Sequence, residues 1–127
     1  MPYVAAGEAL DLGFTDLEAV VRDMGPPPAR VCLVGTPGLR LVLIRWGRGF
    51  ASTPHRHPGA EEIFLVMEGR AAFTIGDEPP REVGPGGFVL AMRGVRHSIR
   101  VLGGGPMTML AAVGPNEDRP DETVESA

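Results

Sequence analysis

Short apolar segments at intervals of about ten residues constrain the fold of this chain more than any other feature. Glycine- and proline-rich turns separate them, as at Gly35 to Gly38 and Gly103 to Pro106. Short strands at this spacing are typical of a β-sandwich or β-barrel. We therefore predict an all-β fold, with strands over residues 30–34, 39–46, 61–67, 70–75, 87–92, 97–102 and 107–113.

One short helix is expected before the first strand. Thr15 to Glu18 form a capping-box pattern, and apolar residues follow at helical spacing. We predict a helix over residues 16–24, which Gly25 and the three prolines after it would end. A chain of 127 residues has the length of one domain. We predict a single domain over 1–127, with an N-terminal segment (1–29), a barrel (about 30–114) and a loose polar tail (115–127).

Charge and composition exclude several classes of protein. The net charge of -4 argues against nucleic acid and anionic membranes as partners. No apolar run approaches the roughly 18 residues that span a bilayer. The first residues lack a basic region followed by an apolar one, so we expect no signal peptide. Cys32 is the single cysteine and cannot form an internal disulfide, which favours a reducing, cytoplasmic location.

The candidate functional residues are three histidines and one carboxylate. His55 and His57 are two residues apart, so on a strand both point to the same face. Pro58 and Gly59 would break that strand, which allows Glu62 to face the histidines. His97 lies forty residues beyond His57 and follows a second glycine-containing turn. We predict that these four side chains bind a metal ion.

Imidazole nitrogens and a carboxylate oxygen suit Zn, Fe, Mn, Ni or Cu and do not select among them. Four protein ligands leave positions for water or substrate on an octahedral ion, and such an open site can act as a Lewis acid. A lone His-x-His pair on a strand is weak evidence, because most such pairs bind no metal. The carboxylate after the break, and the only other histidine after a second turn, favour one divalent transition metal ion.

At these residues the sequence resembles the cupin family. The first cupin motif is glycine, five residues, His-x-His, a glutamate after three or four residues, and glycine after six more. Every spacing is met here by Gly49, His55, His57, Glu62 and Gly69. Glu61 would satisfy the shorter gap but lies seven residues before Gly69, so Glu62 fits the motif better.

The second cupin motif is matched in part. Gly86, Gly94 and His97 occupy their expected positions, whereas Met92 replaces a proline and Val101 an asparagine. Neither replaced residue is a usual metal ligand. The resemblance covers about residues 30–114 and implies a double-stranded β-helix, the jelly-roll barrel of the cupins, here with a short N-terminal helix. It also implies a homodimer, for which we expect a contact through the early strands or the N-terminal segment.

The interior beneath the ion is expected to be apolar. Side chains on the faces of Glu62 and His97, joined by Phe73, would line a substrate pocket: Phe64, Val66, Phe73, Ile99 and Val101. The alternative is that they are ordinary core residues. Arg45, Arg93 and Arg96 could anchor an anionic substrate at the rim, although solvated surface arginines are the commoner case.

The predicted function is that of a metal-binding cupin acting on a small organic molecule. A dioxygenase is the leading class, because an open site with three nitrogens and one oxygen can bind both substrate and oxygen. Glu62 is the candidate catalytic residue, as a ligand that accepts a proton when its metal bond loosens. The alternatives are a metal-dependent isomerase or lyase, a non-catalytic binding or sensing module, and a purely structural metal.

Overall fold

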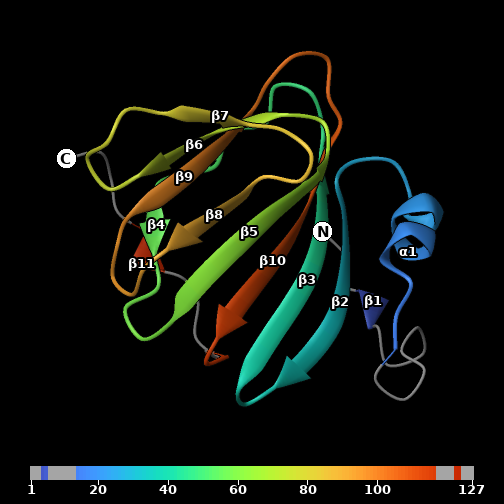
Figure 1. Ribbon diagram of the computed structural model, residues 1–127, viewed down its shortest axis with the longest axis horizontal. Helices are drawn as coiled ribbons and strands as arrows, with labels where there is room; N and C mark the ends of the chain where they lie inside the picture. The colour runs from blue at the N-terminus through green and yellow to red at the C-terminus, as the bar shows by residue number, and fades with distance from the viewer. Residues whose placement is uncertain (1–3, 6–13, 117–121, 124–127) are drawn as a thin grey trace.

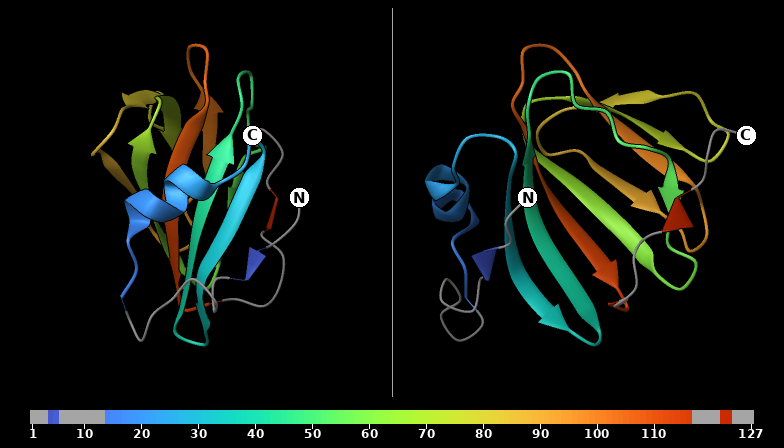
Figure 2. Two further views of the ribbon diagram at one scale, coloured as in Figure 1. Left: turned by 90° about the vertical axis from the view of Figure 1, so that its right-hand side faces the viewer. Right: turned by 180° about the vertical axis from the view of Figure 1, so that it is seen from behind.

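The computed structural model describes residues 4–5, 14–116 and 122–123 of the chain, and two β-sheets account for most of them (Figures 1 and 2). One sheet has the strand order β1-β2-β3-β10-β5-β8, and the other has the order β11-β4-β9-β6-β7. The elements are β1 (Val4–Ala5), α1 (Leu17–Asp23), β2 (Ala29–Thr36), β3 (Leu39–Trp46), β4 (His55–Arg56), β5 (Glu61–Glu68), β6 (Ala71–Ile75), β7 (Arg81–Val83), β8 (Phe88–Ala91), β9 (His97–Val101), β10 (Met107–Gly114) and β11 (Glu122–Thr123).

The core lies between the two sheets, as period-two alternation along the strands requires. On β5, Glu62, Phe64 and Val66 are buried, whereas Ile63 on the opposite face is 43% exposed. Ile99 on β9 belongs to the same buried cluster as Phe64 and Val66. The prediction of an all-β jelly roll with one short helix is confirmed.

The helix covers only part of the outer face of the six-stranded sheet. Leu17 and Val20 pack against Leu33 and Leu43 from β2 and β3. Arg45 of β3 fastens the end of the helix, because its guanidinium donates hydrogen bonds to the carbonyl oxygens of Val21, Met24 and Gly25. A cation at a helix C-terminus satisfies unpaired carbonyls and the helix dipole together. The half of the sheet formed by β5 and β8 carries no helix (Figure 1).

Three local predictions need correction. The N-cap is Asp16, whose carboxylate accepts a hydrogen bond from the Ala19 N–H at 3.2 Å, and not Thr15, the first residue of the capping-box pattern. Strand β7 was not predicted, because three residues give too short a pattern. The tail is not uniformly loose, since Glu122 and Thr123 pair with β4 and extend the smaller sheet. The described part of the chain contains no helix long and apolar enough to cross a bilayer.

Candidate metal centre

The four predicted ligands come together where the two sheets meet. His55 on β4 and His97 on β9 are direct cross-strand partners in the five-stranded sheet. Glu62 lies near the start of β5 in the six-stranded sheet. His57 lies in the connection from β4 to β5. One ligand atom from each residue lies within 4.8 Å of all the others, so the cluster could hold a metal ion.

The turn after His57 sets the direction of the chain, as the sequence predicted. Pro58 and Gly59 form a turn, and the Ala60 N–H donates to the His57 carbonyl oxygen at 3.5 Å. The Gly94 N–H donates to the same oxygen at 2.9 Å, which ties the loop before β9 to the His57 backbone. The second glycine-containing turn therefore helps to hold His57 as well as lead into His97.

Backbone carbonyls orient two of the imidazole rings. Nδ1 of His55 lies 3.1 Å from the Thr53 carbonyl oxygen, and Nδ1 of His97 lies 3.1 Å from that of Val95. A carbonyl only accepts, so each Nδ1 carries a proton, and the Nε2 of the neutral ring would then present a lone pair. Metal-binding histidines characteristically donate their second ring nitrogen in this way. His97 is 2% exposed, and among the described residues its Nε2 makes no hydrogen bond of good geometry, as expected of an atom placed to bind an ion.

The spacing of the ligand atoms fits a single ion. Nε2 of His57 lies 2.7 Å from Glu62 Oε1, and Nε2 of His97 lies 3.4 Å from the same oxygen. Ligand atoms about 2.1 Å from one ion lie roughly 3.0 Å apart at a right angle and 3.4 Å apart in a tetrahedron. The donor set and the buried lone pair of His97 thus fit a divalent transition metal.

The histidines keep the Glu62 carboxylate ionised. Burial raises the pKa of this carboxyl group, but the hydrogen bond with His57 and the nearness of the His97 ring outweigh it, so the pKa lies below its ordinary value. An ionised carboxylate is the form that binds a metal. The neighbouring Glu61 is exposed whereas Glu62 is buried, which agrees with the assignment made from the motif spacing.

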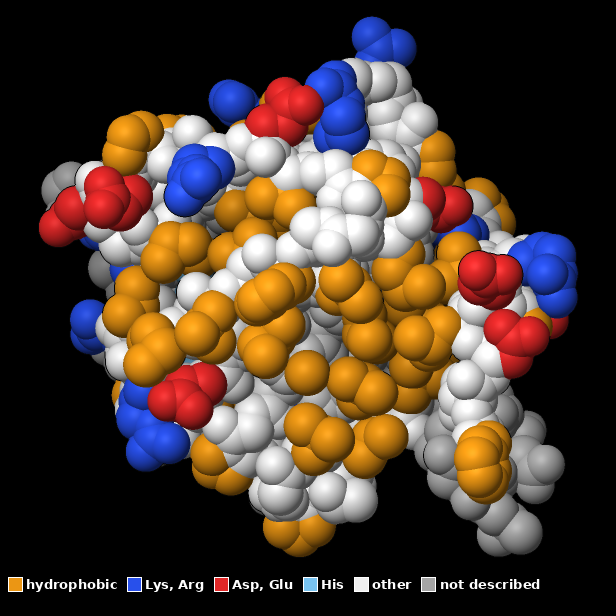
Figure 3. Space-filling model, viewed as in Figure 1, with side chains coloured by type: hydrophobic (Ala, Val, Ile, Leu, Met, Phe, Trp, Pro, Cys, Tyr) orange, Lys and Arg blue, Asp and Glu red, His pale blue; other side chains and the backbone are white. Residues whose placement is uncertain are grey.

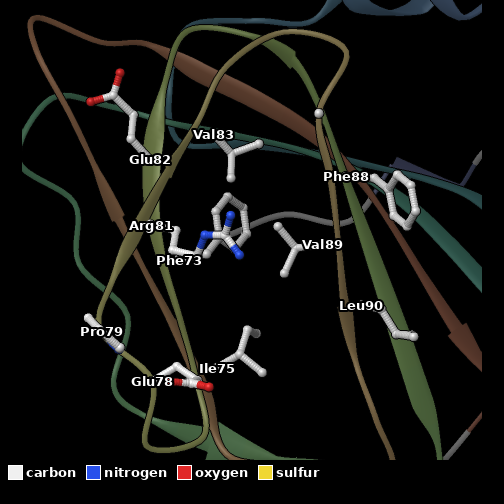
Figure 4. A pocket seen from close by; sticks show the side chains of 11 residues that line it. Phe73, Ile75, Glu78, Pro79, Arg81, Glu82, Val83, Phe88, Val89 and Leu90 are labelled. Atoms are coloured by element: carbon white, nitrogen blue, oxygen red, sulfur yellow. The ribbon is translucent and has the colours of Figure 1, made fainter.

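The five residues predicted to line a substrate pocket are all buried in the core cluster: Phe64, Val66, Phe73, Ile99 and Val101. The Phe64 ring packs between the His97 imidazole and the Phe73 ring, with centroid distances of 5.5 and 5.6 Å. Phe73 also lines a cavity of about 460 Å³ between β6 and β7 on one side and β8 on the other (Figure 4). Ile75, Val83 and Val89 form more of its wall, and sequence reasoning missed them.

Two of the three arginines suggested as possible rim anchors bind other residues of the chain, and Arg93 is exposed. Arg45 donates to Glu68, Thr108 and the helix end on the outer face of the large sheet. Arg96 pairs with Asp77 at 3.0 Å. Arg81, which lines the cavity, was not considered. The alternation of Arg81, Glu82 and Val83 would have revealed its direction, but only once β7 had been recognised.

The fold and the three-histidine, one-glutamate cluster define the cupin class. A family model described as "Cupin domain" matches residues 42–113, which is more than half of the chain. The protein therefore belongs to the cupin family.

Particular relatives can be named. The chain is 35% identical over 75 residues to the dimethylsulfoniopropionate lyase DddQ of Ruegeria pomeroyi, a match that covers 54% of this chain and 37% of the lyase. It thus spans well under half of that relative. The crystal structure of DddQ superposes with a TM-score of 0.67 at 26% identity, covering 83% of this chain and 54% of the other.

Two further solved structures share the fold. An uncharacterized protein with a double-stranded β-helix domain from Klebsiella pneumoniae gives a TM-score of 0.75 at 20% identity, covering 91% of this chain and 94% of the other. KdgF from Halomonas sp. gives 0.65 at 24% identity, covering 73% of this chain and 85% of the other. At these identities the likeness concerns the fold alone.

Proposed function

We propose that this cupin is a metal-dependent lyase that carries out an elimination on a small organic acid. The observation that carries the proposal is the buried cluster in which the unpaired Nε2 of His97 faces the Glu62 carboxylate. A metal ion bound there by His55, His57, Glu62 and His97 would supply a Lewis acid that polarises a substrate oxygen. The 35% identity to a lyase favours elimination over the dioxygenase reaction that the sequence analysis put first.

The residues of the chain would bind and orient the substrate in such a reaction. Phe73, Val83 and Val89 line part of the cavity and would contact the apolar body of a substrate. Because hydrogen bonds and charge interactions with its histidine neighbours lower the Glu62 pKa, this carboxylate suits the role of ligand better than that of proton acceptor. The elimination would transfer the proton on the carbon next to the substrate carboxylate to a water molecule, form a double bond to the following carbon, and release the leaving group from that carbon with its bonding electron pair.

The test uses dimethylsulfoniopropionate itself. Zinc-, iron- or manganese-loaded protein is expected to convert it to acrylate and dimethyl sulfide, which gas chromatography detects in the headspace. The His57→Ala variant should show no release above the uncatalysed rate. Absence of products with every metal, in protein shown to contain the ion, would contradict a lyase acting on this substrate.

A dioxygenase is the second candidate, because three nitrogens and one oxygen leave open positions on an octahedral iron, nickel or copper ion. Oxygen consumption with a panel of catechols, diketones and flavonols would support it. A binding or sensing module would instead be stabilised by a ligand without forming a product.

We place the protein in the cytoplasm, since its single cysteine, Cys32, offers no internal disulfide.

We also propose that a second copy of the chain covers the bare half of the outer face. Two cross-strand rows make an apolar block there: Ala112, Ile63 and Leu90 in one, and Leu110, Leu65 and Phe88 in the other. Figure 3 shows hydrophobic side chains gathered over this face with charged groups toward its margin. An uncharged apolar face is complementary to itself across a two-fold axis. Since α1 covers β2 and β3, we propose the contact on β5 and β8, in place of the early strands that the sequence suggested.

Ile63→Glu should convert the dimer into a monomer. The side chain is 43% exposed at the centre of the block, so in the dimer the new carboxylates would lose water without gaining partners. Light scattering after size exclusion measures the mass. Leu39→Glu is the matched control, because Leu39 is similarly exposed (38%) but lies outside the block. An unchanged mass for the Ile63 variant would contradict the proposed interface.

A further inference from the structure

We infer that the cavity beside the candidate metal centre binds a small monocarboxylate, and that Arg81 holds its carboxylate group. The inference rests on the proposed function, because it treats this cavity as the approach to the metal. It goes further by naming the anchoring residue and the class of ligand.

The direction of Arg81 follows from strand register. Arg81 on β7 is the cross-strand partner of Phe73 on β6, so the two side chains share the inner face of the smaller sheet. Its neighbour Glu82 also borders the cavity, but its carboxylate pairs with Arg70, which neutralises that charge. Figure 4 shows the Arg81 side chain reaching in front of the Phe73 ring, whereas the Glu82 carboxylate points away.

The Arg81 guanidinium has no ion pair or hydrogen bond with any residue that the structure describes. Arg81 is exposed, so water satisfies its five donors while the cavity is empty, and the guanidinium is free to bind a ligand there. The guanidinium fork matches the geometry of a carboxylate, to which it can donate two hydrogen bonds. A bound carboxylate would therefore complete an interaction for which the chain supplies only one half.

Two residues in the cavity wall are neighbours of residues at or beside the metal centre. Ile75 lines the cavity and is the cross-strand partner of His97, and Val89 lines it and is the cross-strand partner of Phe64. Arg81 pairs with Phe73 on β6, which pairs with Ile99 on β9, two residues from His97. Two strand spacings and two residues along β9 place the Cα atoms of Arg81 and His97 roughly 12 Å apart. Both residues lie on the inner face of the smaller sheet, so a short molecule would suffice to reach from one toward the other.

The remaining walls restrict the ligand further. A volume of about 460 Å³ is within the usual range for a small-molecule site. Phe73, Val83 and Val89 would contact an apolar body. Glu78 also lines the cavity and has no ion pair among the described residues, so it disfavours a second carboxylate. These features together favour a monocarboxylate with a short apolar chain.

The experiment measures the binding of butyrate, with butyramide as its uncharged counterpart, to zinc-loaded protein by calorimetry. The unsubstituted protein should prefer butyrate. Arg81→Gln should weaken butyrate binding about tenfold or more, since a charge-assisted hydrogen bond is lost. Arg81→Lys should retain part of the affinity, because the charge remains and the fork is lost. Arg48→Gln, at an exposed arginine in the turn after β3, removes the same charge elsewhere and should change nothing.

Equal butyrate affinity in the Arg81→Gln variant and the unsubstituted protein would overturn the inference, as would failure of the unsubstituted protein to bind butyrate. An inward charge on an edge strand can also serve only to prevent association with another sheet. In that case Arg81→Gln would aggregate while butyrate binding by its monomeric fraction stayed unchanged. Zinc content should be equal in all variants, so a failed elimination assay with Arg81-dependent butyrate binding would contradict the lyase and not this site.

Discussion

Replacement of His57 by alanine should lower the affinity for zinc at least about a hundredfold. The loss of a partner that only orients a ligand already costs ten- to a hundredfold, and His57 would be a ligand itself. Its Nε2 lies 2.7 Å from Glu62 Oε1, so the variant also leaves a buried carboxylate without its nearest partner. Elemental analysis after dialysis, together with a zinc titration, measures the effect.

Thermal unfolding gives a second measurement of the same change. Zinc at a thousand times its dissociation constant stabilises a folded protein by about 4 kcal/mol, and the His57 variant should lose this stabilisation. Ser98→Ala is the control, because Ser98 is adjacent to His97 on β9 but points to the opposite face, where it lines an outer pocket. A His57 variant that is folded, by circular dichroism, and retains its full metal content would disprove the proposed centre.

Gly69→Ala should lower the free energy of unfolding by about 3 kcal/mol or more. A Cβ atom at this position would lie 2.2 Å from the Pro106 carbonyl oxygen and 2.8 Å from the Met107 Cα. Both contacts are with backbone, which cannot rotate away as a side chain can. The residue also has a φ of +75°, which adds conformational strain for alanine. Denaturant unfolding, compared at equal m-values, measures the loss.

Gly49→Ala separates the cost of backbone strain from the cost of the steric contact. Gly49 has a φ of +82°, but a Cβ atom there would meet no described residue within 4 Å, so alanine should cost only the backbone strain, about 1–2 kcal/mol. The two glycines delimit the same sequence motif, yet only Gly69 lies against another loop. If both variants lost the same stability, the close approach of the loop between β9 and β10 would not be what requires glycine at position 69.

The strands and the identities of the candidate ligands could be predicted from the sequence because the signals are local. Side chains alternate with a period of two, so the faces of Glu62 and Phe64 on β5 follow from spacing once the turn at Pro58 and Gly59 is recognised. The same rule placed His97 and Ile99 on one buried face of β9. The division of the chain into a barrel with terminal segments stays a prediction.

The positions of the arginine side chains in space depend on pairing between distant strands, which the spacing of residues along the chain does not encode. The sequence offered Arg45, Arg93 and Arg96 as anchors and gave no reason to choose Arg81. That choice requires the register of β7 against β6, and three residues carry too little pattern to predict such a strand. The arginine expected at a rim, Arg45, instead fastens the helix.

The sequence by itself determined that three imidazoles and one carboxylate share inward faces, because the direction of a side chain on a strand depends only on its neighbours along the chain. Only the tertiary structure decided that His55 pairs with His97 and that Glu62 approaches them from the other sheet. It also decided that Arg81, which has no ion pair among the described residues, lines the cavity beside them. Those relations arise from the register between strands and the packing of one sheet against the other, which involve residues far apart in the chain.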